Sequence, residues 1–181
     1  MLKVFDLPSH AVASYELVSK TAAVVLAGGK GARLGALTRR DCKPALPFGA
    51  HYRNIDFTLS NCANSGIRHI GVATQYRDAS LIRHLERVWS DPTATGGALV
   101  EPWRAHGVGY GGTAEAVYQN WPKIERLDAE RVLVLAGDHV YKMDYRPMLR
   151  DHVTNRADVT VGCVEVPIGA ANQFGVMSVD D

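Results

Sequence analysis

The sequence predicts an α/β protein with a Rossmann-like, mostly parallel sheet flanked by helices. Two apolar runs, residues 21–27 and 131–136, each end in a turn that contains glycine, which is typical of buried parallel strands. Amphipathic stretches at helical spacing separate the predicted strands. Strands that alternate with helices form parallel sheets with right-handed crossovers. The 181 residues are enough for one domain with a hydrophobic core.

Five runs of apolar or β-branched residues are the predicted strands. They are residues 21–27, 69–74, 131–136, 159–166 and a short last one at 174–179. Residues 1–20 are weakly periodic and predict a surface extension, so the expected domain is residues 21–181. Residues 28–49 and 91–110 are predicted to be irregular, because Gly and Pro interrupt them.

Four helices are predicted between these strands. They run from Asn54 to the turn at residues 64–66, over residues 81–89, over residues 113–124 and over residues 144–153. Asn54 is expected to cap the first helix and Asp144 the last, because short polar side chains accept hydrogen bonds from free N–H groups at a helix start. Pro122 predicts a kink or break in the third helix.

Composition and charge are those of an ordinary globular protein. Hydrophobic residues make up 46% of the chain, and 20 basic against 19 acidic side chains leave a net charge of +1. This balance predicts neither nucleic acid nor a membrane as a partner. The three cysteines have no close spacing, so we expect neither a disulfide framework nor a zinc site. With no secretory signal pattern, we expect a reducing cytoplasmic compartment.

The first predicted strand ends in a glycine-rich turn that carries two cations. Gly28, Gly29 and Gly31 allow positive φ angles and a close approach to a ligand, and free N–H groups in such a turn attract phosphate. Lys30 and Arg33 supply positive charge. The turn matches neither GxxxxGK[ST] nor GxGxxG, which argues against a P-loop kinase and an ordinary NAD-binding dehydrogenase. A strand followed by an ordinary glycine turn is the alternative interpretation.

Three predicted strands end in residues suited to one ligand site. The first leads into the glycine turn, the second into Gln75 and the third into Asp138. Ligands of open α/β sheets bind outside the carboxyl ends of the strands, and a carboxylate beside bound phosphates is a place for Mg²⁺. Asp138 as a plain turn residue is the alternative. The residues predict a phosphoryl or nucleotidyl transferase, with Arg33 and Lys43 on the phosphates and Asp138 on Mg²⁺.

The glycine turn and several other stretches resemble a known family. Residues 26–34 with Lys43 and Pro44 are similar to the G-G-x-G-[TS]-R-L…K-P signature of sugar-nucleotide pyrophosphorylases. Further stretches resemble bacterial ADP-glucose pyrophosphorylases, the glucose-1-phosphate adenylyltransferases. They are residues 52–57 with 59–62, 64–68, 136–145 and 174–177. The resemblance covers nearly all of residues 21–181.

The resemblance implies a reaction and a set of roles. Glucose 1-phosphate would attack the α-phosphorus of ATP in a Mg²⁺-dependent step that yields ADP-glucose and pyrophosphate for glycogen synthesis, in an allosteric, cytoplasmic tetramer. The implied catalytic residues are Arg33, Lys43 and Asp138, with Asp138 also the metal ligand. The implied nucleotide site is Leu26, Ala27, Gly28, Gly29, Gly31, Arg33, Gly112 and Thr113. The implied sugar-phosphate contacts are Tyr110 and Gly175, and the implied regulatory residues are Arg40, Arg53, Gln75 and Arg126.

The chain departs from the family pattern at several positions. Ala32 replaces the usual Thr or Ser of the glycine turn, and Gly109 stands where Trp is common. Asp41 and Pro47 replace an Arg and a His of the inhibitor site. Residues 102–110 are a few residues short, and the glutamine that reads adenine in the family has no equivalent there.

The resemblance is to the first half of the family's enzymes. In the family, the Glu-Lys-Pro motif of the sugar-phosphate pocket, the second metal carboxylate and a C-terminal β-helix follow beyond the position of Asp181. We therefore expect this chain to carry mainly the nucleotide half of the site. Two alternatives stay open: a truncated, non-catalytic module that binds nucleotide or another subunit, and a related pyrophosphorylase that uses another nucleoside triphosphate.

Overall fold

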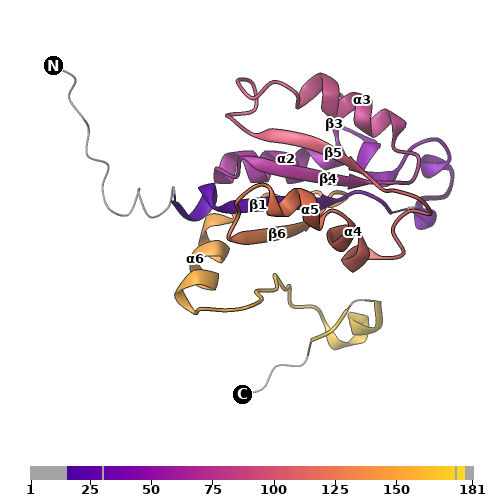
Figure 1. The fold of residues 1–181 in the computed structure, drawn as a ribbon. Helices are drawn as coiled ribbons and strands as arrows, with labels where there is room; N and C mark the ends of the chain where they lie inside the picture. Colours follow the sequence, from indigo (N-terminus) through magenta and orange to yellow (C-terminus); the bar gives the residue numbers. More distant parts are fainter. Residues whose placement is uncertain (1–15, 30, 174, 178–181) are drawn as a thin grey trace.

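The computed structural model describes residues 16–29, 31–173 and 175–177. Its centre is a parallel sheet of four strands in the order β5-β4-β1-β6 (Figure 1). The strands are β1 (Thr21–Leu26), β4 (His69–Thr74), β5 (Leu99–Arg104) and β6 (Arg131–Ala136). The first strand of the chain lies inside the sheet, between β4 and β6. The predicted fold class is therefore confirmed.

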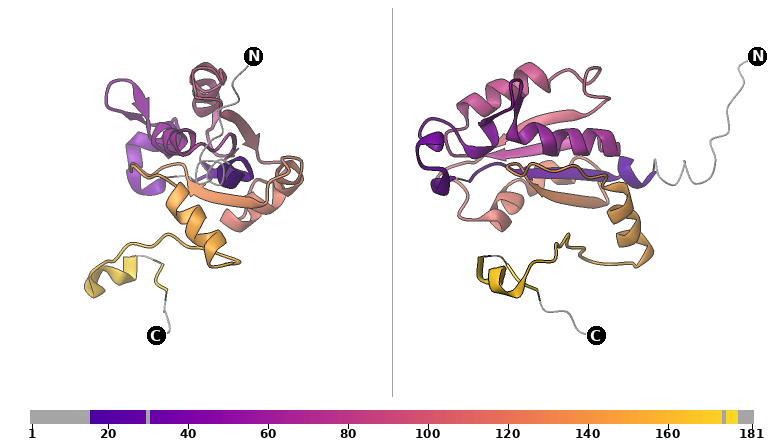
Figure 2. Two further views of the ribbon diagram at one scale, coloured as in Figure 1. Left: turned by 90° about the vertical axis from the view of Figure 1, so that its left-hand side faces the viewer. Right: turned by 180° about the vertical axis from the view of Figure 1, so that it is seen from behind.

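Helices cover both faces of the sheet, as the view along it shows (Figure 2). On one face lie α2 (Asn54–Ser65), α3 (Ala79–Val88) and α6 (Arg146–Thr154), and on the other lie α4 (Thr113–Gln119) and α5 (Trp121–Glu125). Side chains of a strand alternate between the faces. Ala23 and Val25 of β1 thus pack in the larger core, whereas Val24 packs with Trp103 and Ile124 on the other side.

β5 is the strand of the central sheet that sequence patterning missed, because residues 91–110 are rich in Gly, Thr and Pro and were predicted to be irregular. Glu101, Pro102 and Arg104 deprive it of an apolar run. The strand lies at one edge of the sheet, and edge strands tolerate proline because one side needs no ladder hydrogen bonds. Its Trp103 is 3% exposed and lies over Gly71 of β4, where an added Cβ would come within 3.0 Å of the indole ring.

The stretch predicted as an irregular loop over residues 28–49 contains short regular pieces. They are the 3-10 helices η1 (Ala32–Thr38) and η2 (Lys43–Ala45), and strand β2 (Pro47–Phe48), which pairs with β3 (Tyr52–Arg53) in a hairpin. Cys42 and Ala45 are fully buried. Their burial fastens this segment to the core, and burial also raises the pKa of the Cys42 thiol.

The predicted helix from Asn54 to the turn at residues 64–66 is confirmed, but Asn54 is not its cap. Arg53 is the N-cap, and its N–H donates to the Asp56 carboxylate at 2.7 Å. The Asn54 side chain instead donates to the Lys43 carbonyl oxygen at 3.1 Å. Gly66 ends the helix with a φ of 91°, the left-handed conformation that glycine adopts without strain.

The C-terminal elements follow the prediction only in part. The break in the third helix is confirmed, since α4 ends at Gln119 and α5 begins at Trp121. The cap of α6 is Tyr145, one residue beyond the predicted Asp144, whose carboxylate accepts from the Arg146 N–H. The strand predicted over residues 159–166 is not formed, and its valines are exposed. A strand requires a neighbour to pair with, and no described strand pairs with this segment.

The ends of the chain lie mostly outside the described residues. Residues 16–19 are helical, and Val18 is buried in the core, so packing of the domain begins before the first strand. Residues 1–15 of the predicted extension are not described. Near the C-terminus lies the 3-10 helix η3 (Ile168–Gln173). Residues 175–177 do not form the strand predicted at 174–179, and the other residues of that stretch lie outside the described residues. Within the described residues, no helix combines the length and apolar character needed to span a bilayer.

Candidate functional site

A cavity of about 390 Å³ lies at the carboxyl ends of β1, β4 and β6. The chain leaves β1 for β4 on one side, and β6 lies on the other side, so the order of the sheet reverses there. Ligands of open α/β sheets bind at such switch points. The predicted site residues that line the cavity are Leu26, Gly28, Gly29, Gly31, Lys43, Gln75, Tyr110, Gly112, Thr113 and Asp138.

Lys43 and Asp138 meet inside this cavity. The Lys43 Nζ lies 2.9 Å from the Asp138 Oδ2, and the two side chains are 31% and 33% exposed. The His139 Nε2 lies 3.7 Å from the other carboxylate oxygen. An ion pair this close to solvent contributes little to stability, so a charged ligand can separate it at small cost.

A close backbone contact fixes the start of the loop that carries Asp138. The Gly137 N–H donates to the Leu26 carbonyl oxygen at 2.9 Å, which extends the β1–β6 ladder by one bond. A Cβ at Gly137 would lie 3.0 Å from Val25 Cγ1 and 3.2 Å from the Leu26 oxygen. The glycine therefore lets the Asp138 loop run directly beside the end of β1.

The glycine turn folds back on Lys43. Gly31 has a φ of 61°, and its carbonyl oxygen accepts from the Leu34 N–H at 2.9 Å and the Thr38 hydroxyl at 3.1 Å. A Cβ at Gly31 would lie 2.9 Å from Thr38 Cγ2 and 3.2 Å from Lys43 Cβ. Only glycine fits here without strain. Lys30, the first predicted cation of the turn, lies outside the described residues.

Gln75 joins the two loops that border the cavity. Its amide donates to the Gly28 carbonyl oxygen at 3.2 Å and accepts from the Tyr110 N–H at 2.6 Å. Gly109 has a φ of 94°, and a Cβ there would lie 2.7 Å from the Gln75 Oε1. The absence of a side chain at Gly109 thus leaves room for this bridge. A second cavity of about 620 Å³ adjoins it and is lined by the end of β4 and by the loop that follows β5.

Tyr110 is held by both ends of its side chain. Its hydroxyl donates to the Trp103 carbonyl oxygen at 3.0 Å and accepts from the Asn120 amide at 2.9 Å. Burial raises the pKa of this phenol. The hydroxyl is therefore already bonded within the fold, and the ring and backbone of Tyr110 are what border the cavity.

The remaining predicted site residues do not line this cavity. Arg33 is exposed on η1, Ala27 is buried in the core, and Gly175 is exposed far along the chain. The role of Arg33 on the phosphates stays a prediction, because its side chain lies outside the lining. Arg40 is exposed as well.

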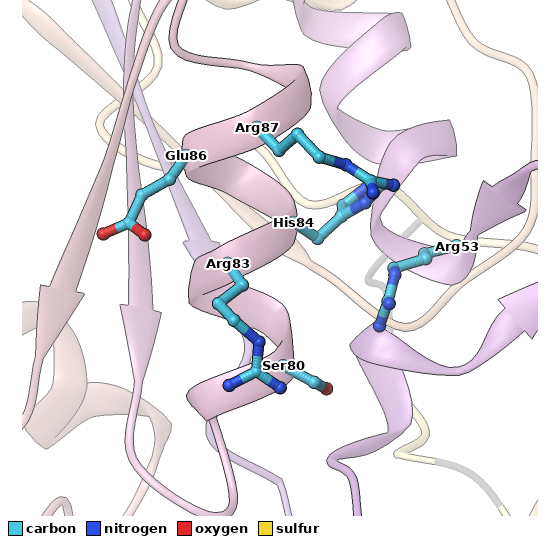
Figure 3. Close-up of a pocket in the computed structure, with 6 residues that line it drawn as sticks. All are labelled: Arg53, Ser80, Arg83, His84, Glu86 and Arg87. Atoms are coloured by element: carbon cyan, nitrogen blue, oxygen red, sulfur yellow. The ribbon is translucent and has the colours of Figure 1, made fainter.

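Two of the predicted regulatory arginines, Arg53 and Arg126, lie on opposite faces of the sheet. Arg53 lines a separate cavity of about 470 Å³ between α2 and α3, with Ser80, Arg83, His84, Glu86 and Arg87. Arg53 and Arg87 point toward this space, and Glu86 points away from it (Figure 3). Arg126 ends α5, on the far face. Within one chain, Arg53 and Arg126 therefore do not share a site.

A buried acid lies behind the arginine cavity, and sequence reasoning missed it. Asp56 accepts from the Trp89 indole at 2.8 Å and lies 2.7 Å from the His84 Nε2. Burial opposes its charge, yet the hydrogen bonds from His84, the Arg53 N–H and Trp89 outweigh burial and lower the pKa of Asp56. No spacing rule pairs residues 28 positions apart on different helices. The network ties the start of α2 to α3.

The Asp138 carboxylate is suited to be one of several ligands of a magnesium ion. Among the described residues, no group of three or more His, Cys, Asp or Glu side chains could hold a metal ion by itself. Mg²⁺ is commonly held by one or two carboxylates together with waters and substrate phosphates. Asp138, partly exposed beside the glycine turn, fits that mode of binding.

The fold and the cavity define an α/β protein with a candidate ligand site at the switch point of its sheet. A family model described as nucleotidyl transferase matches residues 22–181. The chain therefore belongs to the nucleotidyl transferase family.

Curated relatives carry a more specific name. The chain is 55% identical over 168 residues to glucose-1-phosphate adenylyltransferase 2 of Alkalilimnicola ehrlichii. It is 54% and 56% identical to the glucose-1-phosphate adenylyltransferases of Hydrogenovibrio crunogenus and Thiobacillus denitrificans, over 170 and 171 residues. These alignments cover 91–92% of this chain and 39–40% of the relatives. The chain spans about 40% of the length of the curated relatives it matches.

Proposed function

We propose that this chain carries the nucleotide half of a glucose-1-phosphate adenylyltransferase site, which binds ATP with Mg²⁺ for attack by glucose 1-phosphate. The observation that carries the proposal is the meeting of Lys43 and Asp138 above the glycine turn, at the switch point of the sheet. The names of the relatives support the choice of substrates. The proposal includes the family's cytoplasmic oligomer and its role in glycogen synthesis.

The residues of the cavity have different roles in the proposed nucleotidyl transfer. Free N–H groups of the glycine turn bind phosphate oxygens, and Lys43 neutralises their charge. When phosphate enters, Lys43 would exchange its ion pair with Asp138 for a phosphate oxygen, and the Asp138 carboxylate would then be free to hold Mg²⁺. Bound Mg²⁺ would supply further neutralisation of the phosphate charge. No side-chain nucleophile is required, because the sugar phosphate itself attacks the α-phosphorus.

A nucleotide panel tests the proposal. Unfolding of the purified chain is followed with ATP, UTP, GTP and dTTP, with MgCl₂ and with EDTA. ATP with Mg²⁺ is expected to stabilise most, by about 2.7 kcal/mol at a hundredfold excess over Kd. A larger effect of another base would contradict adenylyl specificity. Pyrophosphate release with glucose 1-phosphate separates a catalytic chain from a module that only binds nucleotide.

Asp138→Asn is expected to raise the Mg²⁺ concentration needed for half-maximal ATP binding by about 10–100-fold. The amide keeps the shape of the side chain and removes the charge that a hard cation prefers. The measurement is a MgCl₂ titration of ATP binding. Asp144→Asn is the matched control, since Asp144 belongs to the same loop but pairs with Arg146 outside the cavity. An unchanged midpoint would leave Asp138 as a turn residue.

Of the regulatory residues implied by the resemblance, Arg53 lines a cavity of its own. Three guanidinium groups line it, and guanidinium groups bind phosphate in bidentate fashion. We expect AMP to stabilise the chain, and Arg53→Gln to weaken this effect about tenfold or more. Arg126→Gln on the far face is the control. Equal losses in both variants would contradict binding at the Arg53 cavity, and ATP binding monitors the nucleotide site in each.

A further inference from the structure

Helix α2 carries three buried polar side chains that face the loop after β6. Thr58, Asn61 and Ser65 are 0%, 6% and 2% exposed, and their spacing of three and four residues puts them on one face of the helix. Buried polar groups are costly unless they are hydrogen-bonded. All three are bonded to the backbone of residues 136–145, which connects β6 to α6.

These hydrogen bonds hold the loop on both sides of Asp138. The Thr58 hydroxyl donates at 2.9 Å to the carbonyl oxygen two residues before Asp138. The Asn61 amide donates to the Tyr141 carbonyl oxygen at 3.1 Å and accepts from the Met143 N–H at 3.2 Å. Asp138 therefore lies between two backbone points that α2 fixes.

The same helix anchors the other charged residue of the cavity. Asn54, the first residue of α2, donates from its side chain to the Lys43 carbonyl oxygen. Lys43 and Asp138 are 95 positions apart in the chain, yet their charged groups lie 2.9 Å apart. Because one helix holds the backbone near both residues, it sets the distance between the cation and the carboxylate.

We propose that Thr58 and Asn61 are positioning residues for Asp138, which hold the loop after β6 so that the carboxylate faces a divalent cation and the nucleotide phosphates. The inference rests on the proposed function, because it takes Asp138 as the magnesium ligand. Neither side chain lines the cavity, so both act through the backbone. Groups that orient a metal ligand typically change metal affinity 10–100-fold when they are removed.

Two substitutions at one position separate positioning from general stability. Thr58→Val keeps the shape of the side chain and removes the hydroxyl, whereas Thr58→Ser keeps the hydroxyl and removes a buried methyl group. The measurement is the MgCl₂ concentration at half-maximal ATP binding of the whole chain, with ATP binding in EDTA and urea unfolding recorded alongside. We expect Thr58→Val to raise this midpoint about tenfold. Thr58→Ser should stay within about twofold of the unmodified chain, even where it loses stability.

Asn61 and Ser65 give a second comparison on the same helix face. Asn61→Ala removes both loop contacts near Asp138 and is expected to raise the midpoint about 10–100-fold. Ser65→Ala removes contacts at the far end of the loop, with the Tyr145 N–H and the Asp144 carboxylate, and is expected to leave the midpoint within about twofold. In the Asp138→Asn background, Asn61→Ala should add nothing, because the carboxylate through which it acts is gone.

The outcomes distinguish the two levels of the proposal. If Asp138→Asn raises the midpoint and Thr58→Val does not, the positioning role is wrong and the proposed function stands. If Asp138→Asn itself has no effect, the magnesium role of Asp138 falls, and the positioning role falls with it. Equal shifts for Thr58→Val and Thr58→Ser, or additive effects of Asn61→Ala and Asp138→Asn, would also overturn the positioning role.

Discussion

Asp56→Asn is expected to lower the free energy of unfolding by about 3–5 kcal/mol, because removal of one partner from a buried charged network leaves the others unpaired. Asp56, His84 and Trp89 are 6%, 5% and 8% exposed. The carboxylate also accepts the Arg53 N–H at the start of α2. The Asn side chain has a single acceptor oxygen, which can accept from some of these donors. Its NH₂ group would face the remaining donors, with which it cannot form a hydrogen bond. Urea unfolding at pH 7 measures the loss.

Acid provides an independent check on Asp56. Its folded-state pKa is lowered, so its contribution is complete above the ordinary pKa of about 3.9 and is lost as pH falls through the folded-state pKa. The gap in unfolding free energy between the unmodified chain and Asp56→Asn should therefore be full at pH 7 and narrow below about pH 4. Asp158→Asn, at an exposed position, is the matched control. A gap under about 1 kcal/mol at pH 7 would mean that the network does not hold α2 and α3 together.

Gly71→Ala is expected to cost about 3 kcal/mol, the upper end of the range for overpacking a core. The added methyl group would overlap the indole ring of Trp103, which is almost completely buried between β5 and α5. Neither the β4 backbone nor the ring can move far, since β4 pairs with strands on both sides. Thermal or urea unfolding measures the change.

A matched glycine and a second substitution test the cause assigned to Gly71. A Cβ added at Gly162 would meet no other atom within 4 Å, and the φ angle of this glycine is not positive. Gly162→Ala should therefore change the free energy of unfolding by no more than about 0.5 kcal/mol. In a Trp103→Leu background the overlapping ring is gone, and Gly71→Ala should cost clearly less than it does alone. Simple additivity of the two substitutions would rule out the clash as the reason.

Strands that consist of a short apolar run could be predicted from the sequence, including β6 at one edge of the sheet, whereas a strand without such a run could not. β1 and β4 are covered on both faces and read as short apolar runs. β5 carries Glu101 and Pro102 because an edge strand tolerates them. Residues 159–166 alternate as a strand does, but alternation does not provide the neighbour that would make them one.

The part of the candidate site that lies at the ends of the strands could be predicted from the sequence. The carboxyl ends of parallel strands share one edge, so the glycine turn, Gln75 and Asp138 were expected together, and they line one cavity. The partners of Asp56 depend on how α2 and α3 pack, which no local pattern reports. The same holds for Arg53 and Arg126, whose separation follows from the helices that carry them lying on opposite faces.

The order of the sheet also has a consequence for how the chain folds. β1 pairs with β4, which lies at a moderate separation along the sequence. Its other neighbour, β6, is much farther away in the sequence, because Thr21 pairs with Arg131. Closing a loop on the order of a hundred residues is slow, because the chain loses conformational entropy before the stabilising contacts between the two strands can form. The candidate cavity needs both neighbours of β1, because residues at the ends of β4 and β6 line it. During synthesis, the cavity therefore cannot form until the chain as far as Asp138 has left the ribosome.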